Sequence, residues 1–335
     1  MATTRERIMW IDWMKTIAMF CVIWGHCFPT YLTAFFHTFN IPAFLILSGY
    51  LSRKDTRSTP FWPKFWTALV VPYLLLAFIK AAGAIVKGFP DGSWLTTTGA
   101  ILGGFHSLDG AQGCSNLWFV YSLIIIRLIH HLTHGSLRWM GIFSVVTVIA
   151  AWVLHYYVEM PRWAVSDTLM TLPFYTIGFA LRQKCETQVN RLKDSIGSMN
   201  PALAVLSIVG TLAAAYGISY LNGKPNLYKG DFGSNPLLLT LGAIAGTMFL
   251  FFVCVRLNNI HWKGATIIST GNIVILTFHR ELLHEPIKYI NKGDFAPWLQ
   301  VSLYGLSSLV VILLFIPICW LIIRYVPILV GKRKA

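Results

Sequence analysis

The chain has 335 residues, of which 56% are hydrophobic and only 12% are charged. Soluble domains carry about 25% charged residues, so this composition excludes an ordinary soluble protein and indicates an integral membrane protein. The formal net charge of +14 would also suit a nucleic-acid-binding protein, but the basic residues recur in alternate loops between apolar segments, as the positive-inside rule predicts. The charge therefore indicates topology, with both termini in the cytoplasm, and we expect no nucleic-acid partner.

Ten apolar segments predict membrane-spanning helices. They cover residues 8–29, 35–52, 65–87, 117–135, 138–157, 167–182, 201–221, 235–256, 264–284 and 297–325. Most approach the ~20 residues that cross the hydrocarbon layer, although the second and sixth are short. We predict an all-α polytopic bundle that forms one domain over residues 1–335, without a fused soluble domain. The first segment is interpreted as a retained span and not as a cleaved signal peptide, because Asp12 and Lys15 interrupt it.

Three connections between the spans are long enough to carry structure of their own. Residues 87–116 predict an outside loop that is rich in Gly, Ser and Thr and lies near the membrane interface. The cytoplasmic stretch 182–199 predicts a short surface helix or loop, and the outside loop 222–235 is dense in turn-forming residues. The six cysteines are scattered without metal-ligand spacing, so we expect no metal site.

The first span carries the most informative side chains. A stripe of five residues recurs at alternating spacings of three and four, which places them on one face of a helix: Asp12, Lys15, Met19, Val22 and His26. An ionisable side chain in a membrane span costs about 3 kcal/mol on insertion scales, so each is a candidate functional residue. Lys15 and His26 are separated by about 16 Å along the helix axis. This stripe predicts a polar path through the bilayer.

Each of these residues also has a structural interpretation. His26 could form a hydrogen bond between packed helices. However, Pro29 follows closely and predicts that the helix ends nearby, where the imidazole could reach a cavity and serve as a general base. Lys15 could form a structural ion pair with Asp12, one turn away, or it could bind an anionic ligand that enters from the cytoplasm. The residues alone leave both interpretations of Lys15 open.

A second polar cluster stands near the end of the ninth span. It comprises His279, Arg280, Glu281, His284 and Glu285 in the sequence TFHRELLHEP. Pro286 predicts that the helix ends there, in which case the cluster could belong to an outside loop. We favour a role in lining the site, because a helix that starts near Gly271 places His279 inside the span.

Four segments, taken together and in order, carry a family resemblance. They are IDWMKTIAMFCVIWGH, which contains Lys15 and His26, then FNIPAFLILSGYLSRK, SNLWFVYSLIII and STGNIVILTFH, which ends at His279. This ordered set resembles the membrane-bound acyltransferase-3 family, which includes bacterial O-acetyltransferases of cell-surface glycans.

The sequence departs from the family pattern at two places. Asn40 occupies the position of a frequent histidine, and His37 lies one turn earlier, where it could substitute. The R-x-x-R pair that some members carry before the third span is absent. The nearest basic groups are Arg53, Arg57 and Lys64.

The resemblance implies an O-acyltransferase in the bacterial cytoplasmic (inner) membrane. Its donor would be acyl-CoA from the cytoplasm, with acetyl-CoA as our prediction, and its acceptor a hydroxyl of a cell-envelope or exopolysaccharide sugar, free or lipid-linked. The resemblance also implies that His26 is the essential catalytic histidine and that Lys15 belongs to the donor side. The complete prediction is catalytic roles for His26, Asp12 and His279, donor binding by Lys15, Arg53, Arg57 and Lys64, and acceptor binding by His37, Asn40, Trp118 and Glu281.

Two other kinds of protein share parts of this pattern. A transporter or exporter of a glycan or lipid-linked sugar would also be a many-span bundle with buried charges, although the sequence has neither an inverted repeat nor paired broken helices. A catalytically silent partner of a polysaccharide synthase is the third interpretation. The oligomeric state stays open, with a homo-oligomer among the alternatives.

Overall fold

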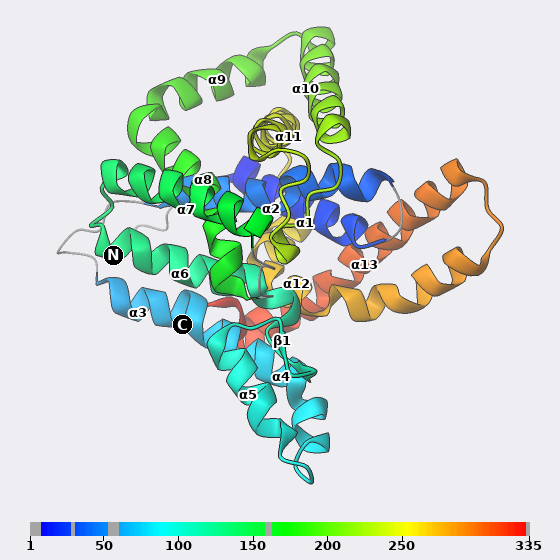
Figure 1. Cartoon of the computed structure of the whole chain (residues 1–335). Coiled ribbons are helices and arrows are strands. Elements are labelled where there is room, and N and C mark those ends of the chain that lie inside the picture. Colours follow the sequence, from blue (N-terminus) through cyan, green and yellow to red (C-terminus); the bar gives the residue numbers. More distant parts are fainter. Residues whose placement is uncertain (1–7, 28–30, 53–59, 158–162, 333–335) are drawn as a thin grey trace.

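The computed structural model describes residues 8–27, 31–52, 60–157 and 163–332. Each of the ten predicted segments contains a long helix, so the prediction of an all-α polytopic bundle is confirmed (Figure 1). The helices are α1 (Met9–Gly25), α2 (Tyr31–Leu51), α3 (Phe61–Phe65) continued by a π-helical segment (Trp66–Val70) into α4 (Val71–Lys87), α6 (Trp118–Leu132), α7 (Leu137–Tyr157), α8 (Ala164–Lys184), α10 (Pro201–Asn222), α11 (Pro236–Arg256), α12 (Lys263–Lys292) and α13 (Pro297–Tyr325).

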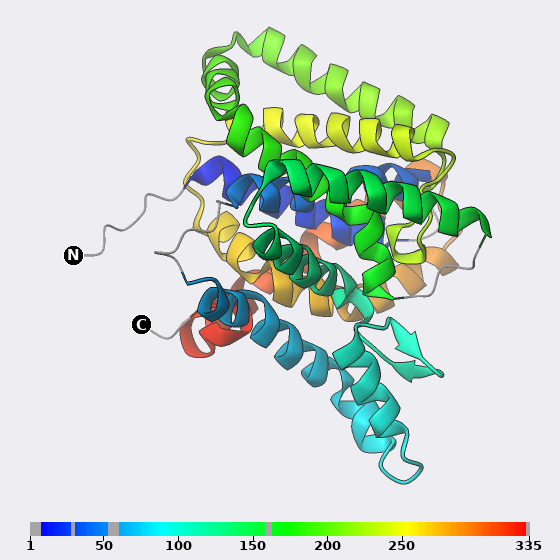
Figure 2. The ribbon, with the colours of Figure 1, turned by 60° about the vertical axis from the view of Figure 1, so that its left-hand side comes forward.

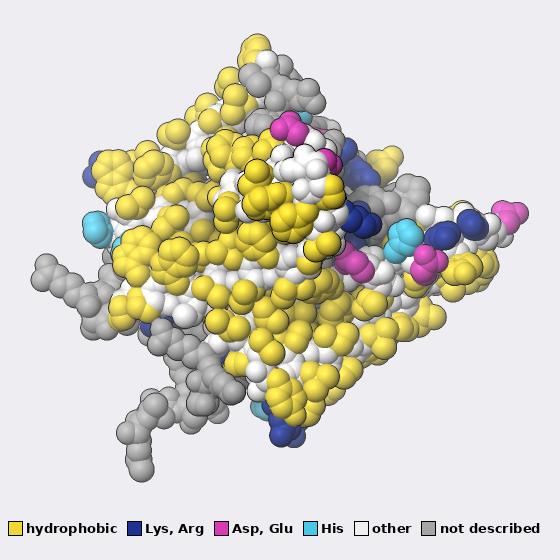
Figure 3. All heavy atoms as spheres, turned by 90° about the horizontal axis from the view of Figure 1, so that it is seen from below, with side chains coloured by type: hydrophobic (Ala, Val, Ile, Leu, Met, Phe, Trp, Pro, Cys, Tyr) yellow, Lys and Arg dark blue, Asp and Glu magenta, His cyan; other side chains and the backbone are white. Residues whose placement is uncertain are grey.

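The helices differ in how many of their residues are buried in the bundle. Seven helical segments of the described chain are long and apolar enough to cross a membrane by length and composition, and α1, α8 and α12 are not among them. Most residues of α1 and more than half of α8 are buried, whereas α7 and α10 expose most of their surface. Hydrophobic side chains dominate the face shown in Figure 3, and most of the charged side chains visible there gather in its right-hand part. This arrangement suits a protein surrounded by lipid, and the number of spans stays a prediction.

The closest helix crossing joins α2 to α8. A Cβ atom added to Gly178 of α8 would lie 1.8 Å from the carbonyl oxygen of Ile46, and one added to Gly49 of α2 would lie 2.0 Å from that of Tyr175. Two glycines therefore let the helix backbones touch. Small residues serve this purpose in membrane bundles, where close packing replaces the hydrophobic effect between helices.

The connection after α4 is more ordered than the predicted loop. It contains α5 (Ser93–Gly103) and a short antiparallel pair of strands, β1 (Ser107–Leu108) and β2 (Ala111–Gln112). α5 packs back along α4, and the two helices project together from the bundle (Figure 2). Ala100 and Ile101 supply the buried face of α5, and the Tyr73 hydroxyl of α4 donates to the Ile101 carbonyl at 2.7 Å. Because this segment is rich in Gly, Ser and Thr, the sequence predicted a loop and not a helix with an apolar face.

Two other connections agree with the sequence. The stretch 182–199 contains α9 (Glu186–Ser198), the helical one of the two predicted alternatives. The loop 222–235 contains one 3₁₀ turn, η3 (Leu227–Lys229), and folds around the buried Asn222. The Asn222 side chain donates to the Phe232 carbonyl at 2.8 Å and accepts from the Asn235 amide at 3.0 Å, so one residue closes the loop. Further 3₁₀ turns are η2 (Ser115–Leu117) and η4 (Pro327–Val330).

The predicted helix end at Pro286 is wrong. α12 continues through Pro286 to Lys292, and its next turn buries Ile290. A proline inside a helix removes one donor and leaves the carbonyl four residues earlier without it. That carbonyl belongs to Leu282, which is 39% exposed, so it lies where solvent can satisfy it. The helix therefore extends beyond the predicted span.

Candidate functional site

Two cavities lie next to each other inside the bundle. The His26 cavity has a volume of about 280 Å³ and the Lys15 cavity about 200 Å³. The four side chains that line both are Val22, Ile41, Phe119 and Leu276. The His26 cavity reaches the 222–235 loop, and the Lys15 cavity reaches η4 near the C-terminus. The stripe that the sequence predicts on α1 therefore contributes side chains to two cavities, which share an apolar wall.

His26 is held at the end of α1 by its own helix. α1 ends at Gly25, in agreement with the end predicted from Pro29, which itself lies outside the described residues. The last carbonyls of a helix have no intrahelical donor, and the His26 Nδ1–H donates to the Val22 carbonyl at 2.6 Å. Since a carbonyl only accepts hydrogen bonds, this contact assigns the proton of the neutral ring to Nδ1 and its lone pair to Nε2.

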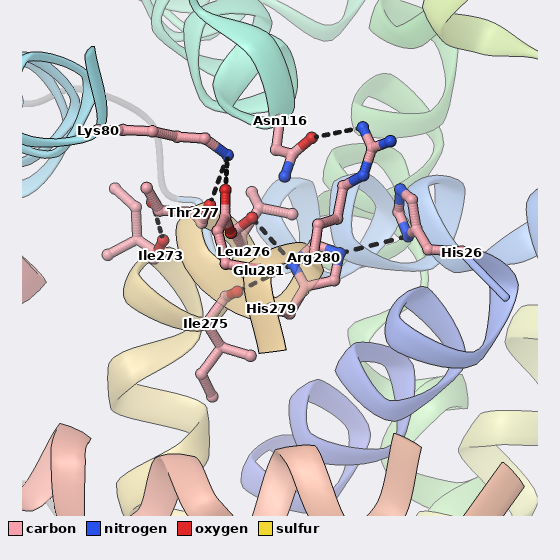
Figure 4. A network of polar contacts seen from close by, with 10 residues as sticks. All are labelled: His26, Lys80, Asn116, Ile273, Ile275, Leu276, Thr277, His279, Arg280 and Glu281. Carbon is pink, nitrogen blue, oxygen red and sulfur yellow. Dashed lines mark hydrogen bonds and ion pairs between the residues drawn. The ribbon is translucent and has the colours of Figure 1, made fainter. Parts of the chain in front are cut away.

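His279 of α12 meets His26 from the neighbouring helix (Figure 4). Its Nδ1–H lies 2.9 Å from the Ile275 carbonyl and 3.0 Å from that of Leu276, so its lone pair is on Nε2. This Nε2 is 3.3 Å from His26 Nδ1, and the two ring centroids are 4.8 Å apart. The His26 Nδ1–H is therefore shared between a backbone carbonyl and a second imidazole.

His37 brings a third imidazole to the cluster. Its ring centroid is 6.1 Å from that of His26, and it lines the His26 cavity. Hydrogen bonds connect the ring to the backbone of Gly25 and of Pro225, so His37 joins the end of α1 to the 222–235 loop. Within the described ranges, no three His, Cys, Asp or Glu side chains are grouped so that they could hold a metal ion.

Lys15 and Asp12 stand at the other end of the stripe. Lys15 lines the Lys15 cavity together with Ser269 of α12. Asp12 is 5% exposed and accepts hydrogen bonds from Ser269 Oγ at 2.7 Å and from Thr266 Oγ1 at 3.4 Å. It lines neither cavity and lies about 21 Å along the axis from His26. These contacts favour fixing α1 against α12 over the predicted catalytic role.

Two predicted acceptor residues lie in the His26 cavity. Asn40 is 2% exposed, and its side-chain oxygen accepts from the Ile41 amide at 2.7 Å. Trp118, at the start of α6, presents its ring beside Tyr228 of η3, with centroids 6.2 Å apart. The cavity therefore combines an amide and two aromatic rings with the histidines.

The other predicted residues lie elsewhere. Glu281 has a half-exposed side chain that forms an ion pair with Lys80 at 3.0 Å, and it does not line the His26 cavity. Lys64 is exposed on α3 and lines neither cavity. Arg53 and Arg57 lie outside the described residues.

Some residues of the His26 cavity were not singled out in the sequence, among them Tyr228 and Lys229 from the 222–235 loop and Asn116, which precedes α6. Arg280 also lines the cavity and belongs to the second polar cluster, for which the sequence favoured a lining role. Arg280 donates to the Asn116 side-chain oxygen at 3.3 Å (Figure 4). The position next to His279 was a signal for Arg280, whereas the loop residues carry no local signal.

A buried hydrogen bond between His106 and Asp167 supports the 222–235 loop. His106 Nε2 and Asp167 Oδ2 are 2.7 Å apart, with both side chains at most 1% exposed. The His106 ring stacks on Tyr228, with centroids 4.0 Å apart and planes inclined by 10°. The pair therefore fixes an aromatic wall of the cavity. Neither His106 nor Asp167 was singled out in the sequence.

A second polar network joins α2, α6 and α8 beyond the Lys15 cavity. The buried Tyr175 hydroxyl donates to Ser52 Oγ at 2.7 Å and lies 2.6 Å from His130 Nδ1. Arg127 donates to the same hydroxyl and to Ser52 Oγ, each at 3.0 Å. His130 is fully buried within this network.

Comparison with known proteins gives one family and one relative. A family model described as an acyltransferase domain matches residues 8–324. The chain is 21% identical over 340 aligned positions to a protein named "Inner membrane protein YcfT" from Escherichia coli (strain K12), and the alignment covers 89% of this chain and 87% of that protein. No solved structure matches the chain.

Proposed function

Since the chain belongs to the acyltransferase-3 family and is an acyltransferase of the inner membrane, we propose that it transfers an acetyl group from acetyl-CoA to a sugar hydroxyl. The donor enters from the cytoplasm, and the acceptor is a cell-envelope or exopolysaccharide glycan. One observation carries the proposal: a cation and a histidine occupy adjoining cavities that share one apolar wall.

The Lys15 cavity suits the donor. Coenzyme A is an anionic head on a long, thin arm, and Lys15 offers a positive charge on the side of η4. Lys15 and His26 are about 16 Å apart along α1, so an extended arm could run from the one to the other. The common wall of four apolar side chains would then surround the arm near its thioester.

The His26 cavity suits the hydroxyl and the chemistry. The acceptor oxygen attacks the thioester carbonyl carbon, the C–S bond breaks, and the thiolate leaves with its electron pair. His26 Nε2 takes the hydroxyl proton, because the contact with the Val22 carbonyl assigns Nδ1 the donor role. The imidazolium that forms is stabilised at Nδ1–H by Val22 and by the lone pair of His279 Nε2. His279 is a positioning residue in this scheme.

The lining of the His26 cavity supports a sugar acceptor. Trp118 and Tyr228 offer aromatic faces, which suit the apolar face of a sugar ring. Asn40 and His37 supply polar groups beside His26. A pocket with an apolar lining and a few placed polar groups is typical of a small-molecule site.

Replacing His26 by glutamine tests the proposal. Glutamine keeps the size and a hydrogen bond but takes no proton, so acetyl transfer should fall by about 10²–10⁴-fold. Binding of acetyl-CoA, measured by calorimetry on the purified protein, should survive, because Lys15 lies in the other cavity. His284→Gln, at an exposed position near the end of α12, is the matched control and should leave the rate of acetyl transfer unchanged. Transfer at a near-normal rate in the His26 variant would refute the assignment.

A further inference from the structure

The charged residues that line the His26 cavity all have one sign. Lys229 and Arg280 line it, and no Asp or Glu does so among the described residues. Lys229 belongs to η3 and Arg280 to α12, so two separate elements bring their charges to the same space.

The acid that follows Arg280 is engaged elsewhere. Glu281 follows Arg280 in sequence but points to Lys80, with which it forms an ion pair at 3.0 Å (Figure 4). No carboxylate of the described chain lies within 4.0 Å of the charged groups of Lys229 or Arg280. The hydrogen bond from Arg280 goes to the neutral Asn116, which orients the guanidinium without neutralising it.

A third cation, Lys224, stands in the same loop as Lys229. Partial burial lowers the pKa of Lys224, and the positive charge of Lys229 lowers it further. The two lysines are therefore close enough to interact.

We propose that the acceptor sugar carries an anionic group, a carboxylate or a phosphate, that binds to Arg280 and Lys229 while its hydroxyl faces His26. The inference rests on the proposed function and names the class of its acceptor. A planar guanidinium matches carboxylate and phosphate oxygens with two parallel hydrogen bonds, and a lysine adds a point charge. Trp118 and Tyr228 would hold the sugar ring between the anion and the histidine.

The test measures acceptor binding without requiring turnover. Full-length protein in nanodiscs is treated with diethyl pyrocarbonate, and mass spectrometry follows the modification of His26. Glucose, glucuronate and glucose 1-phosphate are added as probes that share one ring and differ in charge. We expect glucuronate or glucose 1-phosphate to slow the modification, and glucose at the same concentration to leave it unchanged. The comparison of the two anions identifies a carboxylate or a phosphate.

Variants then assign the binding to these cations. Arg280→Gln and Lys229→Gln should each raise the half-protecting concentration by about tenfold, the effect of losing a charge-assisted hydrogen bond. Lys292→Gln, at the last turn of α12 and outside the cavity, is the matched control and should change nothing. Thermal melts of all variants verify that the fold is retained.

The outcomes separate this inference from the proposed function. Equal protection by glucose and by the anions, no protection by any probe, or unchanged protection in both Gln variants overturns the anionic acceptor. If Arg280→Gln lowers kcat but leaves the half-protecting concentration unchanged, Arg280 stabilises the negative charge that develops in the transition state and does not bind an anion of the acceptor. That result would also overturn the anionic acceptor. Failure of the wild-type protein to bind or turn over acetyl-CoA would refute the proposed function, whatever the anions do.

Discussion

Replacing His279 by leucine removes the second imidazole from His26 with little change in buried volume. His279 is fully buried, and its Nδ1–H contacts carbonyls of its own helix, so leucine leaves no donor stranded there. The His26 Nδ1–H keeps the Val22 carbonyl at 2.6 Å. We therefore expect the variant to fold, and its acetyl transfer to fall through the loss of one hydrogen-bond acceptor.

The geometry sets the size of the effect. A hydrogen bond to a charged group contributes about 1.5–3 kcal/mol, against about 0.5–1.5 kcal/mol between neutral groups. His26 gains its charge in the transition state, so the difference, roughly 1.4 kcal/mol, corresponds to about a tenfold fall in kcat. The contact from His279 is long at 3.3 Å, which argues against a larger effect.

The assay compares kcat and KM in three variants. His279→Leu should lower kcat while the KM for acetyl-CoA is unchanged. His279→Gln offers a side-chain oxygen to His26 and should recover part of the loss, which a purely structural role would not predict. His284→Leu removes an exposed histidine from the same helix and is the control. A fall of 10³-fold or more with the fold intact would show that His279 exchanges protons with the substrate, and no change would show that the contact is inconsequential.

The remaining predictions concern the donor side, the packing and the topology. Lys15→Met should weaken acetyl-CoA binding by about tenfold in a calorimetric titration, as the loss of one charge-assisted hydrogen bond implies, and unchanged affinity would contradict the donor role. Gly178→Ala should lower the melting temperature, because its Cβ would lie 1.8 Å from a carbonyl oxygen, whereas Gly210→Ala, with no atom within 4 Å, should not. Cysteines at Ser107 and Lys332 should be labelled from opposite sides of the membrane, and labelling from one side would contradict the ten-span topology.

The helices were predictable because their signal is local. A run of apolar residues about long enough to cross the bilayer is visible in most of the segments, and the spacing of Lys15 and His26 identified one face of α1. The wrong helix end at Pro286 has a local cause as well. The sequence shows the proline, but it does not show that the freed carbonyl of Leu282 lies at an exposed position.

Much of the site depends on contacts between distant segments and was not predictable from local signals. Tyr228 and Lys229 stand in a polar loop whose position is fixed by Asn222 and by stacking on His106. Asp167 meets His106 from 61 positions away in the sequence. No periodicity connects such residues, so their roles follow only from the folded arrangement.

In the proposed topology, the His26 cavity opens to the outside and the Lys15 cavity to the cytoplasm, and a protein built in this way must keep ions from leaking across the membrane. The four side chains between the two cavities, Val22, Ile41, Phe119 and Leu276, are all apolar. An ion that crossed this layer would leave its hydration shell at a cost of several kcal/mol. The uncharged arm that carries the acyl group can enter this apolar layer. In the proposed reaction the bundle therefore passes the acyl group across the membrane without conducting ions.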